Sequence, residues 1–328
     1  MSKIDEVLRF VKGAVAKKNF EPALTHFRIE NGTIRSSNGI ISLSSPIDLD
    51  IECTPDAGQF VKAISNSGDD MVLTMLPSGR LSIRSEKFKA FVNCHNDENV
   101  PHPLPEGDII EFEPSMLITA IQELMPFVGD DASRSWTNGI HFNGQFAYAT
   151  NNVTMAQYWL KGINVVTPFT IPRVALTELL RIKMLPISIQ ADANSATFHF
   201  EDSRWIRTNL LEGDWPLKTF ETILSSPSDC KPLPDDFFDG LASIKDFTNN
   251  MNCVFIKGST LQTNLEKNIG ASFELSKRIV GENIVCFAHP ILNELKNLSN
   301  LSIDLSTYPK PCLFYAGLMR GAIMGVRI

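Results

Sequence analysis

The sequence has 328 residues, of which 43% are hydrophobic, and it carries a net charge of −7. A chain of this length exceeds the usual size of one hydrophobic core, so we expect two or three domains. The acidic balance argues against a protein that wraps nucleic acid over its whole surface, but it leaves open a positive charge confined to one face.

The chain has no sequence signal for a membrane, a metal or a catalytic site. It has no long apolar run and no signal-peptide core at its start, so we expect a cytoplasmic protein. The six cysteines are scattered, with no Cys-x-x-Cys pair, and the histidines have no ligand spacing, which indicates reduced cysteines and no metal. Without a P-loop, a Gly-x-Ser-x-Gly turn or a dinucleotide-binding glycine pattern, we expect no enzymatic activity and no cofactor.

The first third of the chain begins with helical periodicity over residues 5–17, where apolar residues recur every three or four positions. A strand segment at 24–31 follows, and a second helix is predicted over 59–65. A β-meander comes directly after that helix, with strand segments at 71–76, 79–85 and 88–94. A proline-rich linker at 100–108 ends this part.

The same order of elements follows twice more. The middle third has helices at 115–127 and 173–183, and the last third has helices at 235–247 and 290–298, after a polar linker at 225–234. In segment 195–201, Ala196, Phe198 and Phe200 alternate with polar residues, so one face of that sheet should be buried. The strand segments of these two thirds are 138–144, 145–152, 186–192, 195–201, 204–210, 253–258, 260–266, 301–306, 312–317 and 320–328.

These elements form a threefold internal repeat. The spacing from Phe60 to Leu176 and from Leu176 to Leu292, equivalent apolar positions of three helices, is 116 residues in both cases. Each third contains two helices and each helix leads into strands, so the chain reads as six similar β-α-β-β-β modules, the first without a clear leading strand. Three domains of similar build follow, at residues 1–107, 108–228 and 229–328.

Four phrases placed in order along this repeat resemble the bacterial β-type sliding clamp, the processivity subunit of the replicative DNA polymerase. They are FTIPRVALTELL at 169–180, LLEGDWP at 210–216, Asn138-Gly139 followed by Ala149-Thr150, and AIMGVRI at 322–328, which is similar to the family's V-M-P-M-R-L ending. The resemblance spans the whole chain. The departures from the family's phrases lead us to expect a phage-encoded relative, active in the host cytoplasm.

The resemblance implies an α+β fold of three tandem DNA-clamp domains, two subunits of which close head to tail into a dimeric ring with helices inside and sheets outside. Such a ring holds duplex DNA topologically, so weak attraction to phosphates, without sequence readout, is enough and still permits sliding. A clamp of this kind tethers the replicative polymerase to DNA. A protein of the same fold that does not encircle DNA, such as an inhibitor, remains the alternative.

If the helices line a hole, their exposed faces should carry positive charge. Helix 235–247 departs from this pattern, since it is net acidic with Lys245 as its one cation. Trp136 has two open interpretations, a DNA contact and a core tryptophan. The residues expected to face DNA are Arg9, Lys12, Lys17, Lys18, Lys62, Arg134, Trp136, Arg173, Arg181, Lys183, Lys245 and Lys296.

The family also implies a groove between the second and third domains that holds a hydrophobic peptide of the polymerase or the clamp loader. The sequence departs from the family here, since Asn-Asn-Val-Thr at 151–154 replaces Asp-Gly-His-Arg, and Gly325 replaces a proline. We therefore expect an altered peptide preference, in a groove that methionine can adapt. Its expected residues are Thr150, Asn152, Val153, Thr154, Met155, Ile223, Leu224, Ile323, Met324, Gly325, Val326 and Arg327.

Subunit contacts should join the first domain of one copy to the third domain of the other, edge strand to edge strand. Ring closure would satisfy the unpaired strand edges, which are otherwise prone to association. The expected interface residues are Ala90, Val92 and Phe247.

Overall fold

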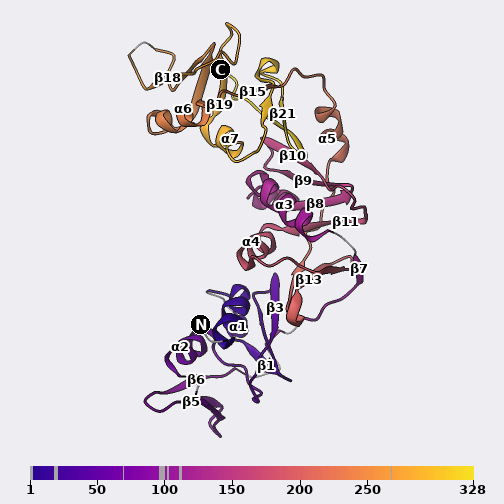
Figure 1. The fold of residues 1–328 in the computed structure, drawn as a ribbon, viewed down its shortest axis with the longest axis vertical. Helices are drawn as coiled ribbons and strands as arrows, with labels where there is room; N and C mark the ends of the chain where they lie inside the picture. The colour runs from indigo at the N-terminus through magenta and orange to yellow at the C-terminus, as the bar shows by residue number, and fades with distance from the viewer. Residues whose placement is uncertain are drawn as a thin grey trace. The chain divides into compact units, whose positions relative to one another are not determined.

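The structure is a computed structural model that describes residues 3–17, 21–68, 70–95, 100–101, 103–110, 113–266 and 268–328. The chain divides into two compact units, the first made of residues 1–118 and 171–211 and the second of residues 119–170 and 212–328. These units cut across the predicted middle domain, because its two halves join different sheets (Figure 1). The division into three domains stays a prediction. None of the helices described is long and apolar enough to span a membrane.

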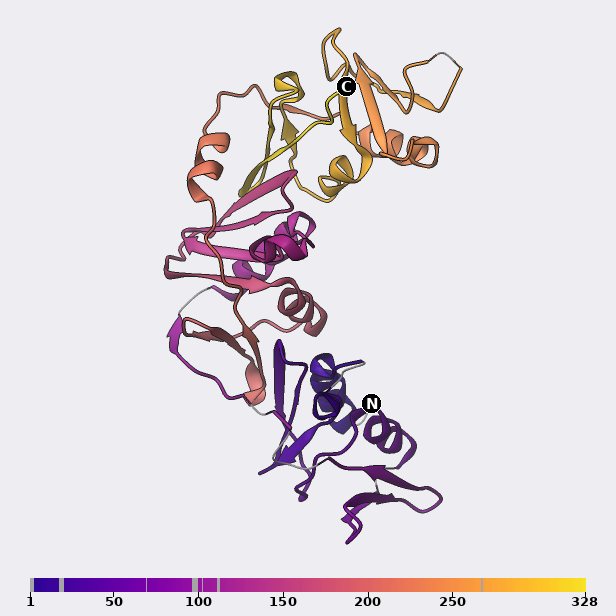
Figure 2. The same ribbon diagram turned by 180° about the vertical axis from the view of Figure 1, so that it is seen from behind.

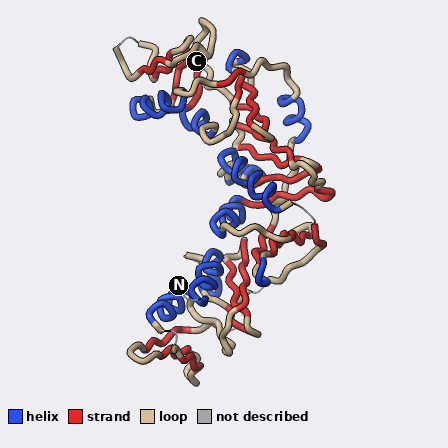
Figure 3. The backbone as a smooth tube through the Cα atoms, in the orientation of Figure 1, coloured by secondary structure: helices blue, strands red, loops and turns tan. Residues whose placement is uncertain are grey.

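The described part of the first unit includes the helices α1, α2 and α4. Helix α1 (Lys3–Val11) buries Val7, Leu8, Phe10 and Val11 and packs against β3 (Figure 3). Helix α2 (Ala57–Asn66) begins where the Asp56 side chain accepts a hydrogen bond from the backbone N–H of Gln59 at 2.7 Å, a helix N-cap. Helix α4 (Arg173–Ile182) ends at Lys183, which has a positive φ of 55°.

A seven-stranded antiparallel sheet forms the centre of the first unit, in the order β1-β2-β3-β14-β13-β12-β7. Strands from the two ends of the unit meet where β14 pairs with β3, with Ile206 opposite Leu43. The strands are β1 (Arg28–Glu30), β2 (Thr33–Ser37), β3 (Ile41–Pro46), β7 (Asp108–Ile110), β12 (Ser188–Ala191), β13 (Ser195–His199) and β14 (Trp205–Asn209).

The alternation predicted for 195–201 is confirmed on one face, since Ala196, Phe198 and Phe200 are buried. The opposite face is more covered than the pattern predicts, because Thr197 is also fully buried. It lies between Gln190 of β12 and Arg207 of β14 in the sheet register, and the stems of these long side chains can cover it.

A second, smaller sheet of the first unit contains β4 (Val72–Met75), β5 (Arg80–Arg84) and β6 (Lys89–Asn93) in that order. It is the meander predicted after the second helix. Helix α2 packs beside β6, and the backbone N–H of Asn93 donates to Gln59 Oε1 at 3.1 Å. No named strand pairs with the outer side of β6 in the part of the chain that the structure describes, although the carbonyl oxygen of its last residue, Asn93, accepts a hydrogen bond from the backbone N–H of Asp56 at 2.8 Å.

The second unit is built around an eight-stranded sheet in the order β11-β8-β9-β10-β22-β21-β20-β15. The middle and last thirds of the chain meet in this sheet, where β10 pairs antiparallel with β22 and Met155 lies opposite Ala322. Its strands are β8 (Gly139–Gly144), β9 (Phe146–Thr150), β10 (Thr154–Trp159), β11 (Val165–Pro172), β15 (Lys231–Pro232), β20 (Ser302–Ile303), β21 (Cys312–Ala316) and β22 (Met319–Ile323).

A four-stranded sheet completes the second unit, in the order β18-β17-β16-β19. Its strands are β16 (Cys253–Lys257), β17 (Thr260–Gln262), β18 (Ser272–Glu274) and β19 (Val285–Ala288). Helix α6 packs against β18, and α5 packs against β22 (Figure 2). The helices are α3 (Pro114–Leu124), which starts in the first unit, α5 (Leu217–Leu224), α6 (Phe237–Ile244) and α7 (His289–Glu294).

Several helices are shorter than their apolar periodicity predicts. Helix α1 gives way after Val11 to a 3₁₀ turn at Lys12–Ala14, and similar turns follow α3 at Met125–Phe127 and α6 at Lys245–Phe247. The strand expected at 301–306 ends after Ile303, because the Asp304 side chain accepts a hydrogen bond from the backbone N–H of Ser306 at 3.0 Å and starts a 3₁₀ turn. At the end of this strand a local side-chain hydrogen bond therefore overrides the periodicity.

Candidate functional site

The cationic side chains expected to face DNA are exposed wherever the structure describes them. Lys18 lies outside the described residues. Exposure is required for phosphate contact but does not establish it. The exposed cations are Arg9, Lys12, Lys17, Lys62, Arg134, Arg173, Arg181, Lys183, Lys245 and Lys296.

Arg9 and Lys12 lie on the side of α1 that faces α2. Together with Asp5 and residues of α2 they line a cavity of about 360 Å³ between the two helices. Lys62 is exposed on α2, next to Val61 of the cavity wall. Three positive charges of the first two helices therefore gather in one region, as a phosphate-facing surface requires.

Arg181 has a structural role that the sequence did not reveal. Its Nε donates to Glu178 at 2.8 Å, and its Nη2 donates to the carbonyl oxygen of Phe10 at 3.1 Å, at the C-terminal end of α1. A guanidinium here satisfies carbonyl groups that the helix leaves unpaired and balances the charge of the buried Glu178. A Cβ at Gly13 would overlap the Glu178 carboxylate, so a larger residue here would displace that side chain from its contact with Arg181.

A cluster of aromatic and aliphatic side chains, called here the aromatic cluster, lies between α5 and the eight-stranded sheet. It comes from β9, β21, β22, α5 and the segment before α5. Its buried members are Tyr148, Trp215, Phe220, Leu224, Leu313 and Ala322, and the partly buried side chains packed around them are Trp136, Phe146, Met155, Leu217, Ile223 and Cys230.

Trp136 belongs to the edge of this cluster. Its ring meets that of Trp215 edge to face, with centroids 5.1 Å apart. Gly213, at φ +134°, lets the backbone pass beside Trp136, where a Cβ would lie 3.0 Å from that residue's own Cβ. Of the two interpretations, packing within the protein is the one that the contacts support.

His141 stacks on the other tryptophan of the cluster. Its ring lies 5.0 Å from that of Trp215 with an interplanar angle of 12°, and its Nδ1 lies 3.0 Å from Thr170 Oγ1. Burial lowers the pKa of His141 to about 4, so the imidazole is neutral at neutral pH. The indole N–H of Trp215 is buried without a hydrogen-bond partner among the described residues.

The residues expected for the peptide groove differ in burial in the structure. Met155, Ile223 and Leu224 belong to the aromatic cluster, and Asn152, Val153, Met324 and Arg327 are exposed. Thr150, Thr154 and Ile323 are buried in the β9–β10–β22 region, so their side chains position the strands. Gly325 and Val326 are half-buried, and the N–H of Val326 donates to the carbonyl oxygen of Cys286 at 2.8 Å.

Sequence reasoning missed the buried hydrophobic centre of this region, formed by Tyr148, Trp215, Phe220 and Leu313. The apolar positions were visible in the strand segments and in the LLEGDWP phrase. The sequence could not show that these positions converge, because their convergence depends on β21 and β22 lying beside β10.

Side-chain hydrogen bonds tie the turn between β9 and β10 to neighbouring segments. Arg134 Nη1 donates to Asn152 Oδ1 at 2.8 Å, and Asn151 Nδ2 donates to Glu294 Oε1 of α7 at 3.0 Å. Burial raises the pKa of Glu294 to about 7, and its Oε2 is buried without a partner in the described structure.

The residues expected at the subunit contact differ in the exposure of their side chains. Phe247 is 59% exposed, whereas Val92 is 1% exposed and packs inside the first unit. Because side chains alternate along a strand, the exposed apolar residue of β6 is Phe91, next to the half-buried Ala90. Val92 therefore presents no exposed side chain to a second chain, and the edge-strand contact itself stays a prediction.

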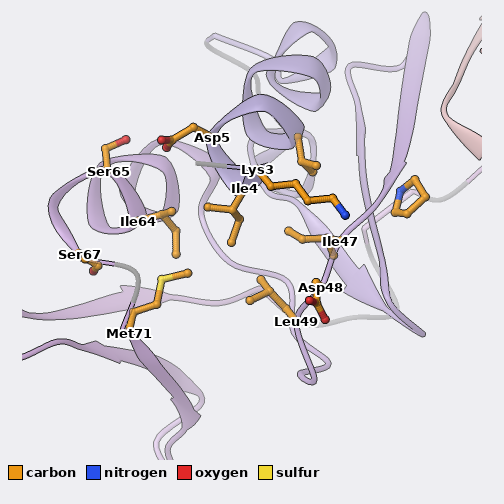
Figure 4. Close-up of a pocket in the computed structure, with 13 residues that line it drawn as sticks. Lys3, Ile4, Asp5, Ile47, Asp48, Leu49, Ile64, Ser65, Ser67 and Met71 are labelled. Atoms are coloured by element: carbon orange, nitrogen blue, oxygen red, sulfur yellow. The ribbon is translucent and has the colours of Figure 1, made fainter. Parts of the chain in front are cut away.

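The first unit also contains a cavity of about 850 Å³ at the start of α1 (Figure 4). Ile4, Ile47 and Ile64 contribute apolar walls, and Lys3 and Asp48 contribute charge. None of the residues expected to contact DNA, a peptide or a second subunit lines this cavity.

Comparison with known proteins identifies the fold. No protein-family model matches the sequence, and no curated protein matches it. The β chain of DNA polymerase III from Streptococcus pneumoniae superposes with a TM-score of 0.85 at 17% identity, covering 99% of this chain and 97% of that chain. The sliding clamp from Bacillus subtilis gives 0.83 at 18% identity, with 99% and 97% covered. The Helicobacter pylori β clamp bound to a DNA ligase peptide gives 0.81 at 17%, with 99% and 98% covered.

The fold is therefore that of the bacterial sliding clamps over essentially the whole chain, and the predicted structural resemblance is confirmed. At identities of 14–19% the likeness establishes the fold.

Proposed function

We propose that this chain is a DNA sliding clamp, two copies of which close head to tail into a ring around duplex DNA and tether a polymerase to it. The observation that carries the proposal is the way the sheets are assembled. Each large sheet joins the last strand of one half-module to the last strand of another, as β3 pairs with β14 and β10 pairs with β22.

One such pairing is incomplete within a single chain. The order β19-β16-β17-β18 repeats the order β11-β8-β9-β10, so β18 corresponds to β10, the strand that pairs with β22. In the same way β4-β5-β6 repeats β20-β21-β22, so β6 corresponds to β22. The pairing rule therefore predicts that β18 of one copy binds β6 of a second copy, and two such contacts close a ring.

The chemistry of these two edges supports the pairing. Exposed cations surround β6, at Arg80, Arg84 and Lys89. Strand β18 ends in Glu274, and hydrogen bonds from Ser259 and Thr260 lower the pKa of this carboxyl, which keeps it ionised. Opposite charges at the two edges favour the head-to-tail pairing over the pairing of like edges.

A ring of this kind needs only weak attraction to DNA. The exposed cations on α1, α2 and α4 supply it, whereas α6 carries Asp239 and is followed by Asp246. An uneven, partly acidic lining is compatible with sliding, because retention comes from ring closure. The same acidic helix keeps open the second candidate, a clamp-fold protein that does not encircle DNA.

The tether is assigned to the aromatic cluster. Partly buried apolar side chains such as Met155, Leu217 and Ile223 surround a buried aromatic centre, which is how hydrophobic peptide motifs are bound. The Helicobacter pylori clamp, which has the same fold, binds a DNA ligase peptide. A motif of the replicative polymerase or clamp loader is the corresponding ligand proposed for this chain.

The test combines assembly with retention on DNA. The purified protein should give closed dimeric rings in negative-stain images, and it should remain on nicked circular DNA but leave linear DNA through the ends. Phe91→Asp should abolish the rings, whereas Val72→Asp, at the exposed outer position of β4 in the same sheet, should leave them intact. Half-rings at all concentrations, or equal retention on circles and linear DNA, would sink the proposal and favour the non-encircling alternative.

A further inference from the structure

A row of side chains crosses one face of the eight-stranded sheet on five adjacent strands. The register places each member opposite the next, from β8 through β9, β10 and β22 to β21. The members are His141, Tyr148, Gln157, Arg320 and Tyr315.

Hydrogen bonds fix the orientation of the middle of this row. Gln157 Nε2 donates to the Tyr148 hydroxyl at 3.1 Å, and Arg320 Nε donates to Gln157 Oε1 at 2.5 Å. Gln157 is 3% exposed, so its amide must point its oxygen at the arginine and its nitrogen at the tyrosine. The guanidinium is thereby held in place by a buried partner.

Arg320 lies directly beside the aromatic cluster. Tyr148 belongs to both groups, and Ala322, two residues along β22 from Arg320, is a buried member of the cluster. Residues two apart on a strand share a face and are about 6.5–7 Å apart. An apolar side chain seated at the cluster would therefore bring its chain neighbours within reach of Arg320.

The charge of Arg320 is not neutralised within the described part of the chain. It belongs to none of the ion pairs found there, and its two terminal nitrogens have no hydrogen-bond partner among the described residues. Arg320 is half-exposed. Burial and, to a smaller extent, Glu221 of α5 raise the pKa of Tyr148, and Glu221 makes no ion pair with Arg320 in the described structure.

We propose that Arg320 is a specificity-determining residue that binds a carboxylate of the partner peptide, next to the apolar residues that occupy the aromatic cluster. A planar guanidinium whose Nε is already held presents its two terminal nitrogens as a fork, which matches the two oxygens of a carboxylate. The carboxylate can come from an aspartate or glutamate side chain or from the free C-terminus of the peptide. This inference rests on the proposed peptide tether.

The first experiment uses two pools of synthetic random octapeptides, one with free C-terminal acids and one with C-terminal amides. Each pool is passed over immobilised wild-type protein and over Arg320→Gln, and the retained peptides are sequenced by mass spectrometry. We expect wild type to enrich apolar residues with a neighbouring carboxylate. Arg320→Gln should keep the apolar enrichment and lose the carboxylate.

The two pools separate the sources of the carboxylate. Enrichment of aspartate or glutamate in the amide pool identifies a side chain, and retention confined to the acid pool identifies the terminus. Equal acidic enrichment on wild type and Arg320→Gln, or apolar enrichment with no carboxylate on either, overturns the inference. Loss of apolar enrichment on wild type would overturn the proposed tether itself.

Affinities of one selected peptide give the quantitative test. Arg320→Gln should weaken binding about 10- to 100-fold, the usual range for a charge-assisted hydrogen-bonded pair. Arg320→Lys keeps the charge without the fork and should fall between wild type and Arg320→Gln, which guards against a folding defect. Lys218→Gln, which removes an exposed cation from α5, is the matched control and should bind like wild type. Glu221→Gln removes the nearby carboxylate and should bind as tightly as wild type or more tightly.

Discussion

We predict that ionisation of the Glu294 side chain lowers the stability of the folded protein. The carboxyl group lies where α7 meets the turn between β9 and β10, and one of its oxygens accepts a hydrogen bond from Asn151 while the other is buried without a partner among the described residues. Burial raises its pKa from 4.5 to about 7. Above pH 7 the folded protein must therefore hold a charge where it prefers a neutral acid.

The sign of the pH dependence follows from this shift. The folded state binds the proton more tightly than the unfolded state, so the contribution of Glu294 to stability falls as pH rises from about 4.5 to about 7 and is constant above that. At about 1.4 kcal/mol for each pH unit, the free energy of unfolding can fall by at most about 3.5 kcal/mol over this interval. Partial contact with solvent screens the charge, so we expect the free energy of unfolding to fall by about 1–2 kcal/mol.

The test is thermal unfolding of wild type and Glu294→Gln at pH 5 and pH 8. Glutamine keeps an acceptor for Asn151 and cannot ionise, so the variant should gain stability relative to wild type at pH 8. The gain should be about 2–4 °C per kcal/mol, which is typical of a cooperative unit of 150–250 residues. Glu266→Gln, at an exposed position of the second unit, should show no such gain. An equal or lower melting temperature of Glu294→Gln at pH 8 would refute the reasoning.

Three further predictions follow from the same physical arguments. Gly13→Ala should lower the melting temperature because its Cβ overlaps the Glu178 carboxylate, whereas Gly281→Ala, with open space around it, should not. Burial lowers the pKa of His141 from 6.5 to about 4, so its contribution to stability should be lost as pH falls from about 6.5 to 4. In unfolding measurements, His141→Phe should reduce the loss of stability between pH 6.5 and pH 4. Phe91→Asp should shift the dimer to monomer in light-scattering measurements at concentrations where wild type stays dimeric.

Patterns in the sequence were enough to predict the local elements and their repetition. Apolar residues at helical and alternating spacing placed α2, α4 and β13 close to their observed bounds, because these patterns reflect which side of one element is buried. The constant spacing of Phe60, Leu176 and Leu292 gave the repeat, and the ordered phrases gave the resemblance to sliding clamps. The fold followed from these together.

Which residues meet across the chain depends on the tertiary structure. The pairings of β3 with β14 and of β10 with β22 join segments more than 100 positions apart, and no local pattern contains their register. That register sets Arg320 beside Gln157 and brings Leu313 and Ala322 to Tyr148. The tertiary structure also places Arg181 against the C-terminal end of α1, whereas its positive charge on a helix had led us to expect contact with DNA. A local sequence pattern reports the burial of each segment, but the partner of a side chain depends on strand order, which long-range packing determines.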